Sequence, residues 1–201
     1  MNHEGLTPTR SVVLELGDER RAMREGHAFL DEKCLLLAGE MLRELGRHRT
    51  FGKRLRAAYD AAIASLASAV ARHGLEALLV HPSAAAASSR VTASSRSLMG
   101  VRLVAAELTL DGPPHPSAVD RSPEAEACRA SFAALAAVAA QAAASSANLE
   151  RLDAEYRRAV RRARALQDVL LPELDRTLAE LDTRLAELEQ EDAIWMRQGR
   201  Q

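Results

Sequence analysis

The residues with the greatest scope for chemistry in this sequence are its histidines and cysteines, and their spacing offers them no partners. Cys34 and Cys128 are the only cysteines, and neither has a second metal ligand close by in sequence. No His-x-x-x-His pair, Gly-rich phosphate loop, nucleophile elbow or Cys-x-x-Cys motif occurs. We therefore expect no catalytic, cofactor-binding or metal-binding residues. The histidines are scattered, at His3, His27, His48, His73, His81 and His115.

The charged side chains are numerous, balanced overall and uneven in their distribution. The chain carries 27 Lys and Arg against 28 Asp and Glu, which argues against binding DNA or RNA through overall charge. Residues 150–164 hold six arginines and three acidic groups, whereas residues 168–192 hold nine acidic groups and two arginines. These bands are either solvated helix faces paired across to another helix or an electrostatic surface for a partner.

The arginine-rich and acidic bands lie on what we expect to be one very long helix. Between Asn148 and Asp192 the apolar residues recur at steps of about 3.55 residues, with charged residues between them. So narrow a stripe needs a second long helix beside it. Pro172 falls inside this helix and should bend it. The stripe consists of Leu149, Leu152, Tyr156, Val160, Ala163, Leu166, Leu170, Leu174, Leu178, Leu181, Leu185 and Leu188.

A partner helix is predicted near the start of the chain. Thr7 can cap it and Pro8 can occupy its first position, and residues 7–74 form the expected N-terminal helix. Five glycines interrupt it, which we interpret as tolerated small residues or as points where another subunit approaches. Its apolar seam is Val13, Leu16, Met23, Leu30, Cys34, Leu37, Met41, Leu45, Leu55, Tyr59, Ile63, Leu66 and Val70.

The two helices are joined by a central segment of different composition, residues 75–117. An Ala/Ser-rich run to Ser97 is typical of a mobile loop, and residues 98–110 alternate partly, as in a strand or half of a hairpin. Ser122 and Pro123 then begin the C-terminal helix, 122–198. The predicted fold is mainly α: two long antiparallel helices forming a coiled coil, with a small central head.

The expected antiparallel arrangement brings particular residues together. If residues whose numbers sum to about 198 face one another, Glu40 and Glu44 lie beside Arg157, Arg158 and Arg161. At about 1.5 Å per residue, the two cysteines would be roughly 50 Å apart, too far for an internal disulfide. Residues 132–144, mostly alanine, are too weakly apolar for a predicted membrane span, and no signal peptide is evident, so a cytoplasmic protein is expected.

Several separated stretches together are similar to one protein family. They are the opening Pro-Thr-Arg at 8–10 with Gly26 after it, Leu-Met-Gly-Val at 98–101, the arginine-rich stretch with its proline at 161–174, and the acidic end at 188–192. In this order the stretches resemble the D subunit of the rotary V/A-type ATPases, the central-stalk shaft of those machines. The resemblance spans most of the chain.

The resemblance implies a noncatalytic rotor shaft of a proton- or sodium-translocating ATPase or ATP synthase. Its helix ends, near Thr7 to Arg24 and Leu178 to Arg200, would enter the hexamer of catalytic A and B subunits, where the ATP sites would lie. The central segment, about Leu75 to Ser117, would meet the small F subunit of the stalk and the funnel-shaped C/d subunit above the membrane ring. The protein would be cytoplasmic and peripheral to the membrane, with no nucleic-acid partner, no direct membrane insertion and no cofactor.

Two other functions fit the same sequence pattern. Helical periodicity does not say which helix fills each seam, so a free-standing antiparallel coiled-coil scaffold remains an alternative. A divergent paralogue with another partner is a second alternative, because the chain departs from the family pattern at Lys33-Cys34-Leu35, Val104 and Arg164. A membrane-lying helix is disfavoured, because it needs a broad apolar face with a basic border.

Overall fold

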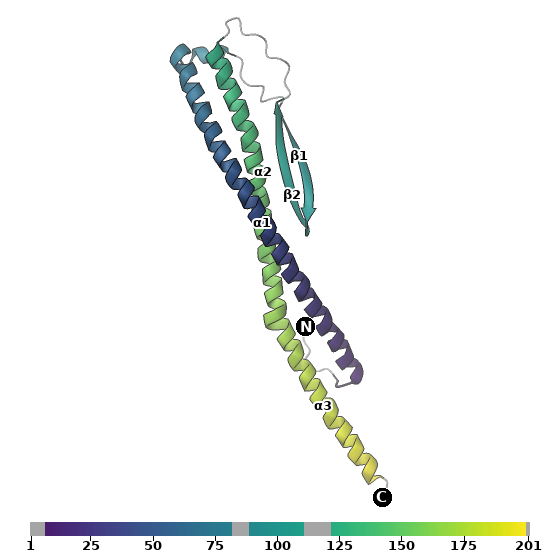
Figure 1. The fold of residues 1–201 in the computed structure, drawn as a ribbon. Helices are drawn as coiled ribbons and strands as arrows, with labels where there is room; N and C mark the ends of the chain where they lie inside the picture. The colour runs from purple at the N-terminus through teal and green to yellow at the C-terminus, as the bar shows by residue number, and fades with distance from the viewer. Residues whose placement is uncertain (1–6, 82–88, 111–121, 200–201) are drawn as a thin grey trace. The chain divides into compact units, whose positions relative to one another are not determined.

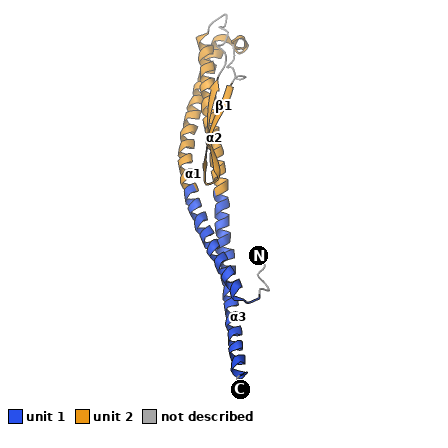
Figure 2. Cartoon of the chain, turned by 90° about the vertical axis from the view of Figure 1, so that its right-hand side faces the viewer, with its two compact units in different colours: residues 1–36, 156–201 blue, residues 37–155 orange. Residues whose placement is uncertain are grey.

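The computed structural model describes residues 7–81, 89–110 and 122–199 and is dominated by helix (Figure 1). The chain divides into two compact units, which are described separately below and are coloured in Figure 2. Unit 1 comprises Met1–Leu36 and Tyr156–Gln201, and unit 2 comprises Leu37–Glu155. The element order is α1 (Arg10–His73), the short 3-10 helix η1 (Ala77–Val80), β1 (Ser89–Leu98), β2 (Val101–Leu110), α2 (Pro123–Ala165), the π-helix η3 (Leu166–Leu170) and α3 (Leu171–Gln198). Two long helices with a small central hairpin confirm the predicted fold class.

In unit 1 the start of α1 packs against α3 through a narrow leucine seam. Leu16 of α1 and Leu174, Leu178 and Leu181 of α3 are all buried and form one hydrophobic cluster. Val12, Val13 and Met23 pack against its edge. The seam works because residues three and four apart lie on the same side of a helix. These residues confirm this part of the expected apolar pattern.

The proline inside the long C-terminal helix is accommodated by a local change of helix type. Pro172 has no N–H, and its ring would clash with the carbonyl four residues earlier in an α-helix. The five residues before α3 form a π-helix, closed by a hydrogen bond from the Leu171 N–H to the Leu166 carbonyl. A π-turn inserts one extra residue into the helical repeat, so the buried stripe shifts. Leu170 is consequently 36% exposed, and its predicted place in the seam was wrong.

In unit 2 the facing surfaces of α1 and α2 are made largely of alanine. Ala62, Ala69 and Ala142 are buried together with Leu37 and Leu152. Tyr59 and Ile63, which the sequence analysis placed in the seam, are 55% and 44% exposed. The smaller side chains face inward because alanine allows two helix backbones to approach closely, whereas larger residues would hold them apart. Apolar periodicity alone could not distinguish the alanine face from the adjacent larger residues.

The beginnings of the two long helices differ in how well they were predicted. The helix α1 begins at Arg10, and Thr9 rather than Thr7 is its cap, because the Thr9 hydroxyl accepts the Val12 N–H at 3.4 Å. At α2 the Ser122 hydroxyl accepts the Ala125 N–H at 3.2 Å, which confirms the predicted cap. Ser122 also lies 2.6 Å from His73 Nε2, so the end of α1 and the start of α2 are tied together.

The central segment contains a regular two-stranded antiparallel hairpin. Strands β1 and β2 pair from Leu98 with Val101 to Ser89 with Leu110 without interruption. The turn residues Met99 and Gly100 have φ values of 48° and 87°, as a tight type I′ hairpin turn requires. The Ala/Ser-rich run was predicted to be a mobile loop to Ser97; from Ser89 onward that prediction was wrong, and residues 83–88 of the run lie outside the described residues. Pairing with β2 gives this polar segment its strand conformation.

The alanine-rich stretch of the second long helix passes a length and composition test for a membrane span, contrary to the sequence-based expectation. The stretch lies within Pro123–Gln198, and only 11% of it is buried. A single helix of this kind is weak support for a membrane segment. Its low burial follows from helix pairing, since one neighbour covers only one side of a helix.

Leu174 and Leu170 provide a matched test of the shifted seam. We expect Leu174→Ala to lower the free energy of unfolding by about 2–4 kcal/mol, because its side chain is 2% exposed and its removal leaves a cavity. Leu170→Ala should cost less, about 1–2 kcal/mol, because Leu170 is 36% exposed and its truncation leaves no enclosed cavity. Urea denaturation followed by circular dichroism measures both, and equal losses would contradict the shift at the π-turn.

Candidate functional site

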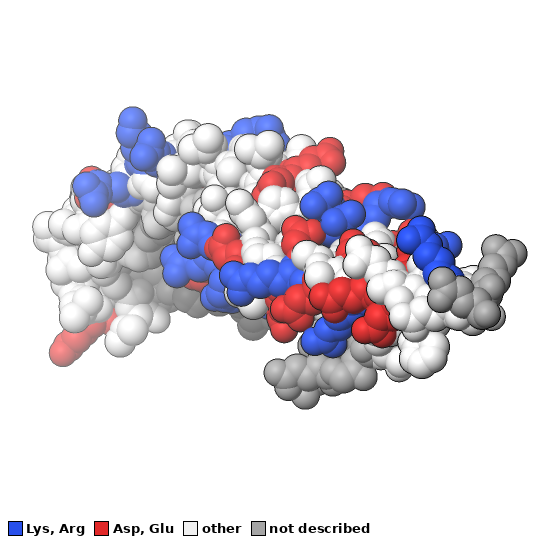
Figure 3. Space-filling view, turned by 90° about the horizontal axis from the view of Figure 1, so that it is seen from below, with Lys and Arg blue, Asp and Glu red and all other residues white. Residues whose placement is uncertain are grey.

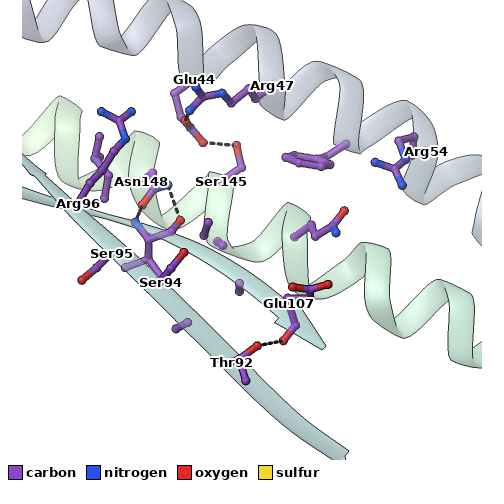
Figure 4. Close-up of a pocket in the computed structure, with 18 residues that line it drawn as sticks. Glu44, Arg47, Arg54, Thr92, Ser94, Ser95, Arg96, Glu107, Ser145 and Asn148 are labelled. Carbon is purple, nitrogen blue, oxygen red and sulfur yellow. Dashed lines mark hydrogen bonds and ion pairs between the residues drawn. The ribbon is translucent and has the colours of Figure 1, made fainter. Parts of the chain in front are cut away.

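Two glutamates of α1 are almost completely buried in unit 2, where α1 faces α2 and the hairpin. Glu40 and Glu44 are each 2% exposed. A buried carboxylate is costly unless it is paired and hydrogen-bonded. Glu40 accepts hydrogen bonds from Arg43 at 2.9 and 2.6 Å and from Arg96 of β1. Glu44 accepts hydrogen bonds from Arg47 at 3.0 Å and from the Ser145 hydroxyl of α2 at 2.7 Å (Figure 4).

The environment of Glu40 keeps it ionised. Burial alone raises its pKa, because removal from water disfavours the charged carboxylate. Hydrogen bonds and charges from Arg43 and Arg96 act in the opposite direction and prevail, so the pKa of Glu40 lies below that of an ordinary glutamate. Arg96 therefore connects β1 to an ionised carboxylate on α1.

A second connection joins β2 to α2. The Asn148 side-chain carbonyl accepts the Val104 N–H at 2.8 Å, and its amide donates to the Val104 carbonyl at 2.8 Å. One buried asparagine thus satisfies both backbone groups of Val104, as a neighbouring strand residue would. The sequence analysis missed Asn148, Ser145 and Arg96. The available signal was a small group of polar residues, Gln141, Ser145, Ser146 and Asn148, in an alanine-rich part of the helix.

These connections surround a pocket of about 840 Å³ between the hairpin, α1 and α2. On the α1 side the Arg54 guanidinium lies 5.9 Å from the centre of the Phe51 ring, within the range of a cation–π contact. On the α2 side the side-chain oxygen of Gln141 is buried and has no hydrogen-bond partner. Thr92 and Ser94 of β1 line the opposite side of this space (Figure 4). The pocket can therefore offer hydrogen bonds and a positive charge to a bound group.

Among the described residues, His73 and His81 are the only two histidines that lie together, and the cysteines are not joined to each other. His27 lies 3.3 Å from Asp31, His48 lies 3.5 Å from Ser146, and His73 lies beside His81 with ring centres 5.1 Å apart. His3 and His115 lie outside the described residues. No group of three potential metal ligands forms within the described ranges.

Both cysteines are free thiols. Burial, with a further contribution from the nearby Asp31 charge, raises the pKa of Cys34, so this thiol is less ionised and less nucleophilic than usual.

Parts of the acidic band are used inside unit 1. Asp175 of α3 lies 3.3 Å from Arg20 and 3.7 Å from Arg24, and Glu189 lies 2.7 Å from Arg10. These exposed ion pairs each contribute little stability, but they show that the acidic side chains pair across to α1. Figure 3 likewise shows acidic and basic side chains interspersed on one face of the molecule.

The expected pairing of the two buried glutamates with arginines of the C-terminal helix stays a prediction, because those arginines belong to unit 1. The sequence analysis placed Glu40 and Glu44 beside Arg157, Arg158 and Arg161. The partners found in unit 2 are the arginines of their own helix, Arg96 and Ser145.

The buried glutamate should make stability depend on pH in the acid range. A carboxylate whose pKa is lower in the folded state stabilises the fold above its unfolded pKa of about 4.3, and this stabilisation is lost as pH falls through the folded value. Glu40→Gln should therefore cost about 1–3 kcal/mol at pH 7, and the difference from the wild-type protein should shrink below about pH 4. Urea denaturation across this pH range measures both effects. Glu150→Gln, at an exposed position of α2, is the matched control. It should change neither the free energy of unfolding at pH 7 nor its dependence on pH.

Comparison with known proteins adds to this structural description. The family model described as the D subunit of ATP synthase matches residues 13–198, which is nearly the whole chain. A search of curated proteins found no match. The matched range includes the leucine seam of unit 1 and the hairpin, glutamates and pocket of unit 2. Because the match extends over far more than half of the sequence, the chain belongs to the ATP synthase D-subunit family, whose members are noncatalytic stalk subunits of rotary ATPases.

Proposed function

We propose that this chain is the central rotor shaft of a V/A-type ATPase or ATP synthase and transmits torque between the catalytic hexamer and the membrane ring. The observation that carries the proposal is the family match over residues 13–198. A shaft requires stiffness rather than a reactive group, and the paired helices and leucine seam of unit 1 are suited to that task. The proposal applies whether the machine makes ATP or pumps protons or sodium ions.

The helix ends of unit 1 carry features suited to a partner cavity. Three consecutive apolar residues of α3 are largely exposed: Ile194 by 54%, Trp195 by 74% and Met196 by 72%. A group of large exposed apolar side chains commonly marks a protein interface. We infer that the ends, residues 7–24 and 178–200, lie inside the hexamer of catalytic A and B subunits. Trp195 would then be a rotating apolar contact with the inner surface of the hexamer.

Unit 2 has an exposed apolar group of its own. Leu75, Leu79 and Val80, in and beside η1, are all largely exposed. They support an assignment in which the small F subunit of the stalk and the funnel-shaped C/d subunit contact the central segment. The chain would thus consist of three parts: an N-terminal long helix at residues 7–74, a central head at 75–117 and a C-terminal long helix at 122–198. Its location would be cytoplasmic, at the membrane periphery.

Native mass spectrometry of complexes purified through an affinity tag after Ala85 tests this function. We expect one copy of the chain bound to a hexamer of three A and three B subunits, as the shaft proposal requires. A homo-oligomer, or a partner unrelated to ATPases, would overturn the proposal in favour of a coiled-coil scaffold or a divergent paralogue.

A matched pair of substitutions tests torque transmission in the same complex. Leu174→Asp places a charge in the buried seam of unit 1 and should reduce assembly, or uncouple ATP hydrolysis from ion transport, by at least roughly tenfold. Leu170→Asp, at an exposed position, should retain most of the coupled activity. Normal coupling in the Leu174→Asp complex would contradict the role of the seam. Coupled ion transport in membrane vesicles, compared with ATP hydrolysis, provides the measurement.

A further inference from the structure

We propose that the outer edge of β1, together with the adjoining pocket, binds an extended acidic segment of a partner protein as a third strand. The inference concerns unit 2 alone and does not depend on the rotor function. It rests on three features: the unpaired backbone groups of β1, the pocket beside them, and the charges that remain unneutralised around it.

The geometry of the hairpin determines which backbone groups of β1 point outward. In a hairpin with a two-residue turn, the residues flanking the turn form a hydrogen-bonded pair, and such pairs then alternate with non-hydrogen-bonded ones. Leu98 and Val101 flank the turn, so the outward groups on β1 belong to Val91, Ala93, Ser95 and Ser97. The same alternation makes Val104 outward-facing on β2, and Val104 indeed bonds outward to Asn148.

The two edges of the hairpin therefore differ. On the β2 edge, Asn148 of α2 satisfies the outward backbone groups of Val104 (Figure 4). Within the described ranges, β1 pairs with no strand other than β2, and nearly all of its residues are exposed. Natural proteins usually protect such an edge with proline, a bulge or outward charges. In β1 there is no proline, the register is unbroken, Arg96 is bound by Glu40, and Arg90 is the one other charged residue of the strand.

The pocket lies where a strand added to β1 would direct alternate side chains. Thr92, Ser94 and Arg96 share a strand face with the buried Leu103, which faces the helices. An added strand would present every second side chain on that same face, toward Phe51 and Arg54 of α1.

The charges favour an acidic segment over a second copy of this chain. Among the described residues Arg54 makes no ion pair, and Arg90 adds a positive group on the pocket face of the hairpin, where Glu107 is the one acidic residue; Arg102 lies on the opposite face. A second copy of β1 would bring two more arginines, Arg90 and Arg96, and no acidic residue to this edge. Like charges that face each other destabilise a strand pair. Apolar side chains alternating with acidic ones would instead contact Phe51 and the free arginine.

A fluorescein-labelled synthetic peptide of alternating valine and glutamate, about eight residues long to match a strand, is the probe. Fluorescence anisotropy with the full chain should show saturable binding. The same peptide with lysine in place of glutamate should bind at least roughly tenfold more weakly, because it meets the arginines with like charge. Equal binding of the two peptides, or no binding of the acidic one, would overturn the proposal.

Two matched pairs of variants locate the binding site. Ser95→Pro removes one outward N–H and should weaken binding roughly tenfold, whereas Ser95→Ala, which keeps the N–H, should not. Arg54→Gln should weaken binding roughly fivefold, and Arg56→Gln, at an exposed position of α1 outside the pocket, should leave it unchanged. Unchanged affinity in Ser95→Pro would overturn the strand-addition geometry.

Hydrogen exchange of the backbone amides in the wild-type chain tests the same geometry without a substitution. It therefore applies even if Ser95→Pro disturbs the hairpin. By NMR, the Val91, Ala93 and Ser95 amides should exchange at least roughly tenfold more slowly with the acidic peptide bound, because they become hydrogen-bonded. Protection confined to other amides would overturn the proposal. Sedimentation of the chain alone tests whether a second copy of the chain, rather than an acidic segment, covers the β1 edge. Self-association that Ser95→Pro abolishes would show that it does and would overturn the proposal.

Discussion

A helix with a single neighbour can bury only one narrow stripe of its surface, and the features of both units follow from this constraint. In unit 1 the stripe is made largely of leucines, and Leu16, Leu174, Leu178 and Leu181 form its buried hydrophobic cluster. In unit 2 it is made mainly of alanines, which bring the backbones close but bury little area per residue. The remaining sides of each helix stay exposed, and the exposed apolar residues of each unit are therefore available to partners.

Thin packing in unit 2 explains why polar interactions are prominent there. Ionised groups are seldom fully buried in proteins, yet Glu40 and Glu44 are, and each is held by arginine. Arginine suits this role because its planar group donates several hydrogen bonds and stays charged. Such a network stabilises less than an apolar core of equal volume, but it specifies position. Through Arg96 and Asn148 it determines where the hairpin lies against the helices, and with it the shape of the pocket.

The π-turn before Pro172 performs a comparable adjustment in unit 1. A proline in a continuous α-helix would break a hydrogen bond and bend the helix sharply. The extra residue of the π-turn removes the conflict and shifts the buried stripe, so that the leucine seam resumes at Leu174. In the rotor shaft that we propose, this adjustment would bear on the stiffness of a helix that carries torque.

The sequence by itself determined the two long helices, the Ser122 cap, the leucine seam near Leu178 and the family to which the chain belongs. These features depend on local spacing, which a linear sequence displays directly. Only tertiary structure decided which face of the first helix turns inward near Tyr59 and Ile63, since alanine and larger apolar residues share the same period. It also decided that the serine-rich segment becomes strand β1, because strand pairing joins residues that local propensity cannot connect. The site around Glu40, Arg96 and Asn148 likewise depends on contacts between segments far apart in the chain.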